Sequence, residues 1–305
     1  MEFITAEKIQ SVLTYGRLIP VMEDALKMFS SKKVVQPIRN IIPVESEGGF
    51  FGSMPSLCEE KEILGTKLVT FYPNNFTRHG RATHNAIIVL FHKNTGIPKA
   101  IMDGEVVTAM RTAAASAVAT KYLAGSGSAS LAILGAGVQA RTHFHALSQV
   151  LNITQVKVWS RTFENAEKVA METGGVACKT AEEAVKDADV IITVTGATTP
   201  VLQAAWVKPG AHINAVGACR YDWCELDPEL TRSAVLYVDS REAALKESGD
   251  VILSKADVYA EIGEVILGQM EAKKNELTIF KSLGISIEDT MAGELVLQMM
   301  AEQST

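Results

Sequence analysis

The sequence lacks both a long apolar stretch and a block of like charges. No uncharged apolar run approaches the roughly 20 residues that a bilayer-spanning helix needs. The opening residues, MEFITAEKIQ, have neither the basic flank nor the continuous apolar segment of a secretion signal. The formal net charge of −6, with no basic patch, argues against a nucleic-acid-binding surface. We therefore expect a cytoplasmic protein that binds neither membranes nor nucleic acids.

Cysteine is also scarce. The four cysteines have no metal-binding spacing, and a chain of 305 residues needs no disulfides to hold its core. We expect reduced thiols and no metal site. With 47% apolar and 21% charged residues, the chain can bury a large core. Its length suggests two domains.

The pattern of short segments changes near residue 125. Residues 36–105 form short extended segments separated by Gly, Pro and Asn, which predicts a mostly antiparallel sheet. The Ala-rich stretch 105–125 predicts a helix that ends at Gly125, and GSGS at 125–128 indicates a domain boundary. Beyond it, apolar strands alternate with helix-like stretches, which predicts an α/β domain with a doubly wound parallel sheet. Residues 287–303 predict an amphipathic helix.

A glycine turn, LAILGAGVQA at residues 131–140, follows an apolar strand and precedes a helix. Gly135 would permit the tight turn, Gly137 would let the backbone approach a pyrophosphate, and Ala140 would let the helix pack closely on the strand. The N-terminus of the helix offers free N–H groups and a partial positive charge. This combination predicts a dinucleotide-binding Rossmann domain.

The end of the next strand indicates which dinucleotide is bound. An NAD site usually has an Asp or Glu roughly 20 residues past the turn, whereas this strand ends in Ser160, Arg161 and Thr162. An Arg fork and two hydroxyls, without a carboxylate, favour the 2′-phosphate of NADP, so we predict NADPH over NADH. A solvated arginine on a loop is the alternative interpretation.

Three cations occupy apolar faces of the first domain. Strand alternation places Arg39 and Lys67 on such faces, and Arg111 lies on an apolar stripe of the Ala-rich helix. A buried charge needs an anionic partner or must extend to solvent. Internal ion pairs are one explanation. Because few acidic residues share these faces, we expect the carboxylate of a bound substrate, which Arg can hold in a bidentate manner. His84, at a strand start, could contact substrate or nicotinamide, or serve as a structural hydrogen-bonding group.

The chain resembles the ornithine cyclodeaminase/mu-crystallin family along essentially its whole length. The resemblance is carried by the segments QPIRN, TKLVTFY, MDGEVVTAMRTAAASAVATKYL, ILGAGVQA, AHINAVGA, DSREAALKESGD and FKSLGISIEDT. It is closest to the mu-crystallin branch of NADPH-dependent ketimine reductases. The resemblance implies a homodimer. It also implies a Rossmann domain over 125–286 and a discontinuous α+β domain, 1–124 with 287–305, for substrate binding and dimerisation.

The resemblance also implies roles for individual residues. Arg39 and Lys67 would engage the substrate carboxylate, Arg111 would lie near nicotinamide and substrate, and Glu247 would be an acid of the ligand pocket. Lys67 and Arg111 are the expected catalytic residues. The family positions around the dinucleotide correspond to Thr83, His84, Asn85, Arg111, Gly135, Ala136, Gly137, Val138, Gln139, Ser160, Arg161, Thr162, Asn165, Thr195, Val216, Lys281 and Ser282.

One position departs from the family pattern. Cyclodeaminases carry a catalytic Asp after the NAVG strand, where this chain has Cys219. The resemblance implies that this position belongs to the substrate-binding site. A free thiol is mostly protonated near pH 7 and substitutes poorly for a carboxylate, which disfavours deamination with ring closure. The mu-crystallin branch usually has Ser there, so Cys219 departs from that branch too.

The resemblance, together with these patterns, implies NADPH-dependent reduction of a cyclic ketimine carboxylate to the L-amino acid, by hydride transfer to C=N. The alternatives are an alanine dehydrogenase-type or cyclodeaminase activity on the same scaffold. A thyroid-hormone-binding or lens structural protein is a further alternative from another functional class.

Overall fold

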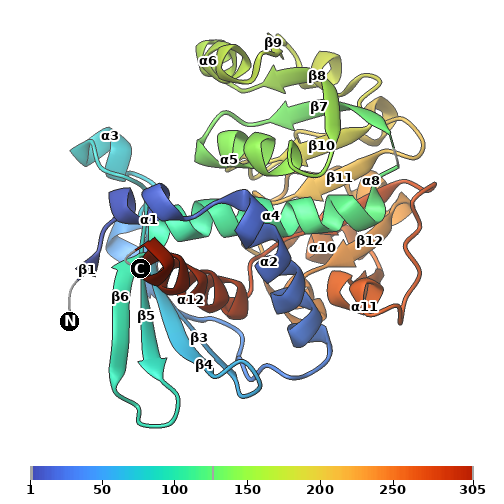
Figure 1. Cartoon of the computed structure of the whole chain (residues 1–305). Coiled ribbons are helices and arrows are strands. Elements are labelled where there is room, and N and C mark those ends of the chain that lie inside the picture. Colours follow the sequence, from blue (N-terminus) through green and yellow to red (C-terminus); the bar gives the residue numbers. More distant parts are fainter. Residues whose placement is uncertain (1–2, 126, 304–305) are drawn as a thin grey trace. The chain divides into compact units, whose positions relative to one another are not determined.

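The computed structural model describes residues 3–125 and 127–303 and consists of two compact units (Figure 1). The first unit contains the chain up to Arg111 together with the segment from Ile285 onward, and the second runs from Thr112 to Gly284. The division falls within helix α4 (Gly104–Leu123), whereas the sequence pattern placed a boundary at residue 125. Each unit is built around a β-sheet of its own.

The sheet of the first unit has the strand order β1-β6-β5-β4-β3-β2 in the described chain. Neighbours from β2 to β6 are antiparallel, as the sequence predicted, and β1 pairs in parallel with β6. The bounds are β1 (Phe3–Ile4), β2 (Asn40–Val44), β3 (Gly49–Cys58), β4 (Ile63–Phe71), β5 (His84–His92) and β6 (Pro98–Asp103). Side chains alternate between the two faces of this sheet.

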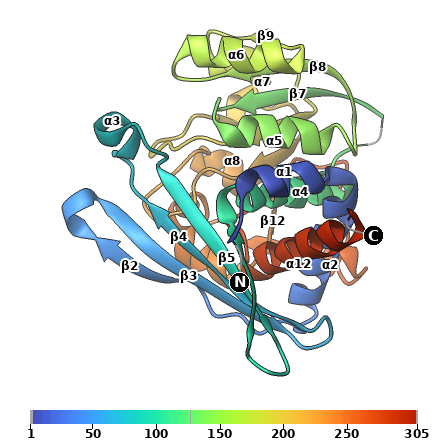
Figure 2. The ribbon, with the colours of Figure 1, turned by 60° about the vertical axis from the view of Figure 1, so that its left-hand side comes forward.

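Helices cover one face of this sheet, as Figure 2 shows for α2 and α12. The helical segments of the first unit are α1 (Ala6–Val12), α2 (Tyr15–Ser30), η1 (Glu45–Glu47), α3 (Asn75–His79), the start of α4, and α12 (Ser286–Gln303). Helix α12 packs against β3, β4 and β5 and against α2. The sequence predicted an amphipathic helix, but nearly all of the first ten residues of α12 are buried, so this part has no exposed polar face. The reason is that the sheet and α2 cover it from different sides.

Gly65 on β4 lets α12 approach the sheet closely. A Cβ at this position would lie 2.7 Å from the carbonyl oxygen of Val89 and 3.0 Å from Cγ2 of Thr290. Thr290 Oγ1 in turn lies 2.8 Å from Ser56 Oγ, within hydrogen-bond distance. The absence of a side chain at residue 65 therefore helps to set how near the residues of α12 lie to β4.

The second unit is a doubly wound parallel α/β domain, which confirms the predicted fold class. Its described strands have the order β13-β12-β14-β11-β10-β7-β8-β9, and every pair is parallel. The strands are β7 (Ser128–Leu134), β8 (Asn152–Trp159), β9 (Val176–Ala177), β10 (Val190–Thr193), β11 (His212–Ala215), β12 (Val235–Val238), β13 (Val258–Glu261) and β14 (Thr278–Lys281).

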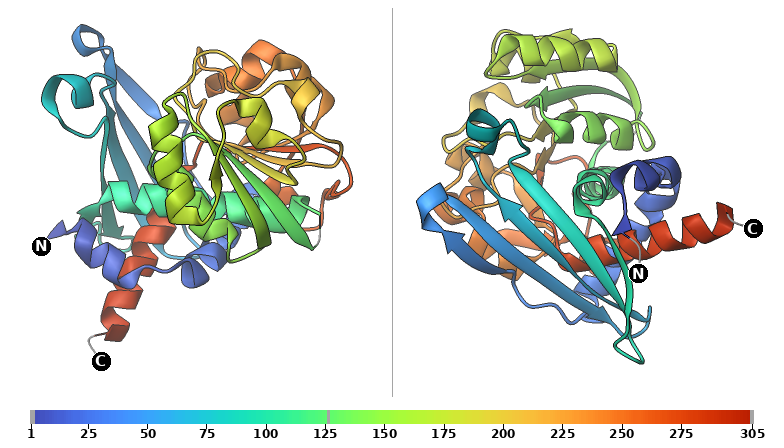
Figure 3. Two further views of the ribbon diagram at one scale, coloured as in Figure 1. Left: turned by 90° about the horizontal axis from the view of Figure 1, so that it is seen from above. Right: turned by 90° about the vertical axis from the view of Figure 1, so that its left-hand side faces the viewer.

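Helices pack against the strands of this second sheet (Figure 3). They are the rest of α4, then α5 (Val138–Leu147), α6 (Phe163–Thr173), α7 (Ala181–Val185), η2 (Ala204–Trp206), α8 (Pro228–Ser233), α9 (Arg241–Glu247), α10 (Gly249–Ser254) and α11 (Ile262–Ile266). The core contains Ile191, Ile213 and Ile279 from three adjacent strands, all fully buried. Within residues 3–125 and 127–303, no helix is both long enough and apolar enough to cross a bilayer.

Candidate functional site

A cavity of about 560 Å³ lies at the carboxyl ends of β7, β8 and β10 in the second unit. The chain proceeds from β7 in one direction along the sheet and from β10 in the other, so the strand order reverses here. Doubly wound sheets bind ligands outside the carboxyl ends of their strands at such a reversal. The predicted cofactor residues among its lining are Gly135, Ala136, Gly137, Ser160, Arg161, Thr162, Asn165 and Thr195.

The glycine turn forms one wall of this cavity. Gly135 has φ of +125°, and a Cβ there would lie 2.7 Å from the carbonyl oxygen of Val194, so only glycine fits. Gly137 is the N-cap of α5 and has no side chain to occupy the N–H groups of the first turn. Ala140 is fully buried. The turn therefore presents uncapped backbone donors to the cavity, which suits a pyrophosphate.

Arg141 supports the turn from within α5. Its Nη1 donates to the carbonyl oxygens of Ala136 at 3.1 Å and Gly137 at 3.3 Å. Its Nε and Nη2 contact the carboxylate of Glu172 on α6 at 2.5 and 2.8 Å. These bonds engage the turn's carbonyl groups. The sequence analysis overlooked Arg141, although an arginine within the first turns after a glycine motif was a usable signal.

The end of β8 has the chemistry expected for a phosphate. Arg161 is exposed and Ser160 half-buried, and Thr162 is the N-cap of α6, with a side chain that makes no capping hydrogen bond. The described residues that line the cavity include no Asp or Glu. The guanidinium of Arg161, the hydroxyls of Ser160 and Thr162 and the N-terminus of the 11-residue helix α6 therefore lie together here, with no carboxylate among the described residues that line the cavity.

Glu225 connects two loops beside the cavity and was also missed by the sequence analysis. It is fully buried, and burial raises the pKa of its carboxyl group. Oε1 accepts hydrogen bonds from the backbone N–H and Oγ1 of Thr195. Oε2 accepts from Thr193 Oγ1 and from the backbone N–H groups of Gly217 and Ala218. Glu225 thereby holds together the segments that follow β10 and β11.

The other predicted residues of the second unit have varied surroundings. Lys281 is fully buried, and its Nζ lies 3.0 Å from Oδ2 of Asp250. Ser282 Oγ is buried and has no hydrogen-bond partner among the described atoms. Val216, Cys219 and Glu247 are half-buried, as is Gln139, whereas Val138 is 65% exposed.

Lys67 and Arg111 form a buried ionic cluster with two acids in the first unit. Nζ of Lys67 lies 2.7 Å from Oδ2 of Asp289. Arg111 contacts Oδ1 of Asp289 through Nε and Oε2 of Glu288 through Nη1, each at 2.8 Å. Both acids come from α12 and are fully buried. The analysis of strand and helix faces overlooked these acids because they lie 177 and 178 residues from Arg111, and still farther from Lys67, in the chain.

The cluster shifts the titration of its members. Burial lowers the pKa of Lys67 to about 8, against the opposing effect of Asp289. Burial would raise the pKa of Asp289, but Arg111 and Lys67 together lower it below its usual value. Burial, then the charges of Lys67 and Arg111, lower the pKa of His84 to about 4. Near neutral pH the site therefore holds a charged lysine and a neutral histidine.

Arg39 precedes β2 and is half-buried. Its charge also lowers the pKa of Lys67, which places it within electrostatic range of the cluster. Ile41 lies two residues further along the chain, and strand alternation places it on the same face as Arg39. It is 41% exposed, so this end of the predicted apolar face is not fully covered. Thr83 is half-buried and Asn85 exposed at the start of β5.

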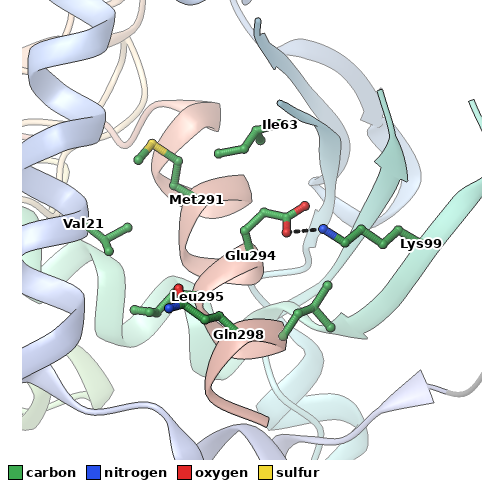
Figure 4. Close-up of a pocket in the computed structure, with 8 residues that line it drawn as sticks. Val21, Ile63, Lys99, Met291, Glu294, Leu295 and Gln298 are labelled. Carbon is green, nitrogen blue, oxygen red and sulfur yellow. Dashed lines mark hydrogen bonds and ion pairs between the residues drawn. The ribbon is translucent and has the colours of Figure 1, made fainter. Parts of the chain in front are cut away.

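A second cavity, of about 410 Å³, lies in the first unit (Figure 4). Met291 and Glu294 of α12 line it, and Glu294 forms an ion pair of 2.5 Å with Lys99. At 3.6 residues per turn, these two side chains project about 200° and 140° around the helix from Asp289. The cavity therefore lies on the other side of α12 from the ionic cluster.

Comparison with known proteins identifies the family. The model of the ornithine cyclodeaminase/mu-crystallin family matches residues 1–304. The chain belongs to this family. This membership confirms the resemblance found in the sequence.

Individual proteins are similar to this chain over almost its full length. The ketimine reductase mu-crystallin of Mus musculus is 52% identical over 300 residues, 96% of each chain. The structure of Thermococcus litoralis Δ1-pyrroline-2-carboxylate reductase in complex with NADH and L-proline is 37% identical, with a TM-score of 0.95 and coverage of 100% of this chain and 99% of that one. An archaeal alanine dehydrogenase dimer with bound NAD is 32% identical, with a TM-score of 0.92 and coverage of 99% and 97%.

Proposed function

We propose that the protein is a nicotinamide-dependent ketimine reductase. It reduces the C=N bond of a cyclic imino acid that carries one carboxylate and yields the L-amino acid. The observation that carries this proposal is that Lys67 and Arg111 are buried side by side, each in contact with Asp289. The second unit of the same chain has a cavity at a glycine turn. Relatives named ketimine reductase and pyrroline-2-carboxylate reductase support the same reaction.

The residues around the second-unit cavity fit a nicotinamide dinucleotide, which supplies a hydride when bound. The uncapped turn from Gly135 to Gly137 would hold the pyrophosphate. Arg161, with Ser160 and Thr162, would hold a 2′-phosphate, so we propose NADPH as the preferred cofactor. The T. litoralis relative was crystallised with NADH, and the side chains after β8 are the basis for a different preference here.

The first unit binds the substrate in this proposal. Lys67 and Arg39 hold the carboxylate, which orients the imine. Such positioning can supply much of the reduction of the activation free energy. An imine accepts hydride best when protonated, and Glu247 would stabilise the resulting positive charge. Arg111, paired with Asp289 and Glu288, completes the cationic side of the site.

The test is an NADPH-oxidation assay across cyclic imino acids of different ring size. We expect turnover of a five- or six-membered imino acid and far less with pyruvate plus ammonia. The reverse preference would identify an alanine dehydrogenase-type enzyme instead. Arg39→Ala should raise KM sharply for carboxylated imines and affect uncharged imines much less, and equal losses on both would contradict the carboxylate role.

The outer face of the first sheet supports a homodimer. Leu68 pairs with Ile87 across β4 and β5, and Leu64 with Phe91, all on the face opposite Lys67. Ile87 is 37% exposed and the other three are half-buried. An apolar face of this kind fits association of two copies, and the archaeal relative is a dimer. Leu68→Glu should convert a dimer into a monomer in light scattering, and a wild-type monomer would contradict this assignment.

Arg39 and Lys67 would also hold the carboxylate of an aromatic ligand such as a thyroid hormone. If it does, triiodothyronine should inhibit imine reduction competitively. Full turnover at saturating hormone would exclude a shared site.

A further inference from the structure

Asp289 contacts both cations of the buried cluster through different oxygens. Oδ2 lies 2.7 Å from Nζ of Lys67, and Oδ1 accepts a hydrogen bond of 2.8 Å from Nε of Arg111. Asp289 is fully buried, and Lys67 and Arg111 are only 3% and 4% exposed. One carboxylate therefore sets the spacing between an ammonium on β4 and a guanidinium on α4.

We propose that Asp289 is a positioning residue, which fixes the Lys67 ammonium, one of the groups that hold the substrate carboxylate, at a set distance from the Arg111 guanidinium. This inference depends on the proposed function, because it concerns the same substrate. Asp289 does not itself contact the substrate in this scheme. Glu288 assists by accepting the Nη1 hydrogen bond of Arg111.

The contacts of α12 indicate that the ionic cluster is not needed merely to hold this helix against the sheet. Neutral hydrogen bonds already attach the start of α12 to the sheet region: Ser286 Oγ donates to the carbonyl of Met54, and Ser56 pairs with Thr290. The backbone N–H of Ile287 donates to Oε1 of Gln36 at 3.0 Å. Because apolar residues can often replace a buried ion pair without loss of stability, docking of the helix does not require these charges.

A positioning role for Asp289 predicts how kcat/KM depends on pH. Lys67 faces Asp289 on α12, Arg111 on α4 and His84 on β5, and it also senses Arg39 before β2. The pKa of Lys67 is about 8, so kcat/KM should fall above that pH as the ammonium is lost. The pKa of His84 is about 4, so His84 does not titrate in this range. Asp289 raises the pKa of Lys67, and its removal should move the fall to lower pH.

The decisive variant is Asp289→Asn, compared with Glu294→Gln on the opposite side of the same helix. Both changes convert an acid to its amide and remove one acidic partner of a lysine. For Δ1-pyrroline-2-carboxylate, Asp289→Asn should raise KM at least tenfold at pH 7 with a smaller change in kcat, and shift the alkaline fall by about one pH unit or more. Glu294→Gln should leave KM and the pH of the fall at wild-type values.

Binding of L-proline, measured by calorimetry without turnover, separates this inference from the proposed function. If the wild-type protein binds L-proline and Asp289→Asn binds it at least tenfold more weakly, the positioning role stands whatever imine is reduced. A melting curve shows whether the variant is folded. A folded Asp289→Asn protein with wild-type L-proline binding and an unshifted pH profile would overturn the inference, as would a wild-type protein that binds no L-proline. A wild-type protein that binds L-proline but reduces no imine would overturn only the proposed function.

Discussion

Glu225 and Thr195 are joined by two short hydrogen bonds at the edge of the cavity outside β7, β8 and β10. Oε1 of Glu225 accepts from the backbone N–H of Thr195 at 2.6 Å and from its Oγ1 at 2.7 Å. Thr195 lines the cavity, whereas Glu225 is buried beneath it. The position of a cavity wall therefore depends on a carboxylate that is not part of that wall.

Replacing Glu225 by Gln should lower the stability of the second unit. The amide nitrogen cannot accept the N–H bonds that one carboxylate oxygen now accepts, so buried donors lose their acceptor. We expect a loss of about 2–4 kcal/mol in the free energy of unfolding, measured by urea denaturation. The exposed Glu229→Gln, a few residues along the chain in α8, serves as the control and should change stability by less than about 0.5 kcal/mol. Equal stabilities of the two variants would contradict the role given to Glu225.

Replacing Arg161 by Ala should weaken NADPH binding and leave NADH binding unchanged. The guanidinium would contact only the 2′-phosphate, and a charge-assisted hydrogen bond contributes about 1.5–3 kcal/mol, roughly a 10- to 100-fold change in Kd. Titration of both reduced cofactors by fluorescence measures the difference. If NADPH affinity does not change, Arg161 does not determine the cofactor.

Replacing Arg141 should weaken the binding of both cofactors equally, because the turn that it supports would contact the pyrophosphate that NADPH and NADH share. Arg141→Met retains the apolar stem and loses the bonds to the carbonyls of Ala136 and Gly137. We expect both dissociation constants to rise roughly tenfold, which corresponds to about 1.4 kcal/mol. Glu172→Gln, which removes the acidic partner but not the turn contacts, should have a much smaller effect. A variant selective for one cofactor would assign Arg141 to a different part of the ligand.

Two buried histidines should make stability depend on pH below neutrality. Burial lowers the pKa of His143 and of His212 to about 4, from about 6.5 in the unfolded chain. The unfolded state therefore binds more protons between these values, and stability is lost as pH falls from about 6.5 toward 4. The loss by pH 5 should be about 2 kcal/mol per histidine.

Denaturation at pH 8 and pH 5 tests this pH dependence. His212→Gln cannot titrate and should reduce the difference between the two pH values by about 2 kcal/mol. His79→Gln, at the end of α3 where no residue is buried, is the matched control. An unchanged difference in His212→Gln would show that this histidine is protonated in the folded state.

The sequence predicted those features that depend on neighbouring residues. Strands β2 to β6 lie within residues 36–105, where short extended segments were predicted, and the glycine turn lies between β7 and α5 as expected. Strands β13 and β14 and helices α1 and α2 were not predicted, because short or mixed segments take their structure from tertiary packing. The acids that pair with Lys67 and Arg111 escaped notice for a related reason. Face patterns within one segment do not show which distant segment packs against it.

The discontinuous first unit has a consequence for biosynthesis. Residues 112–284 leave the ribosome before α12 does, so the second unit has its complete sequence first. Until residue 289 emerges, Lys67 has no carboxylate from Asp289, and the sheet face that carries it is without its covering helix. Multi-domain chains generally fold from the N-terminus as they are made, but here the first unit must be completed last. A nascent chain stalled with residues up to 284 outside the ribosome and α12 still inside it should therefore carry a folded second unit and a protease-sensitive first one.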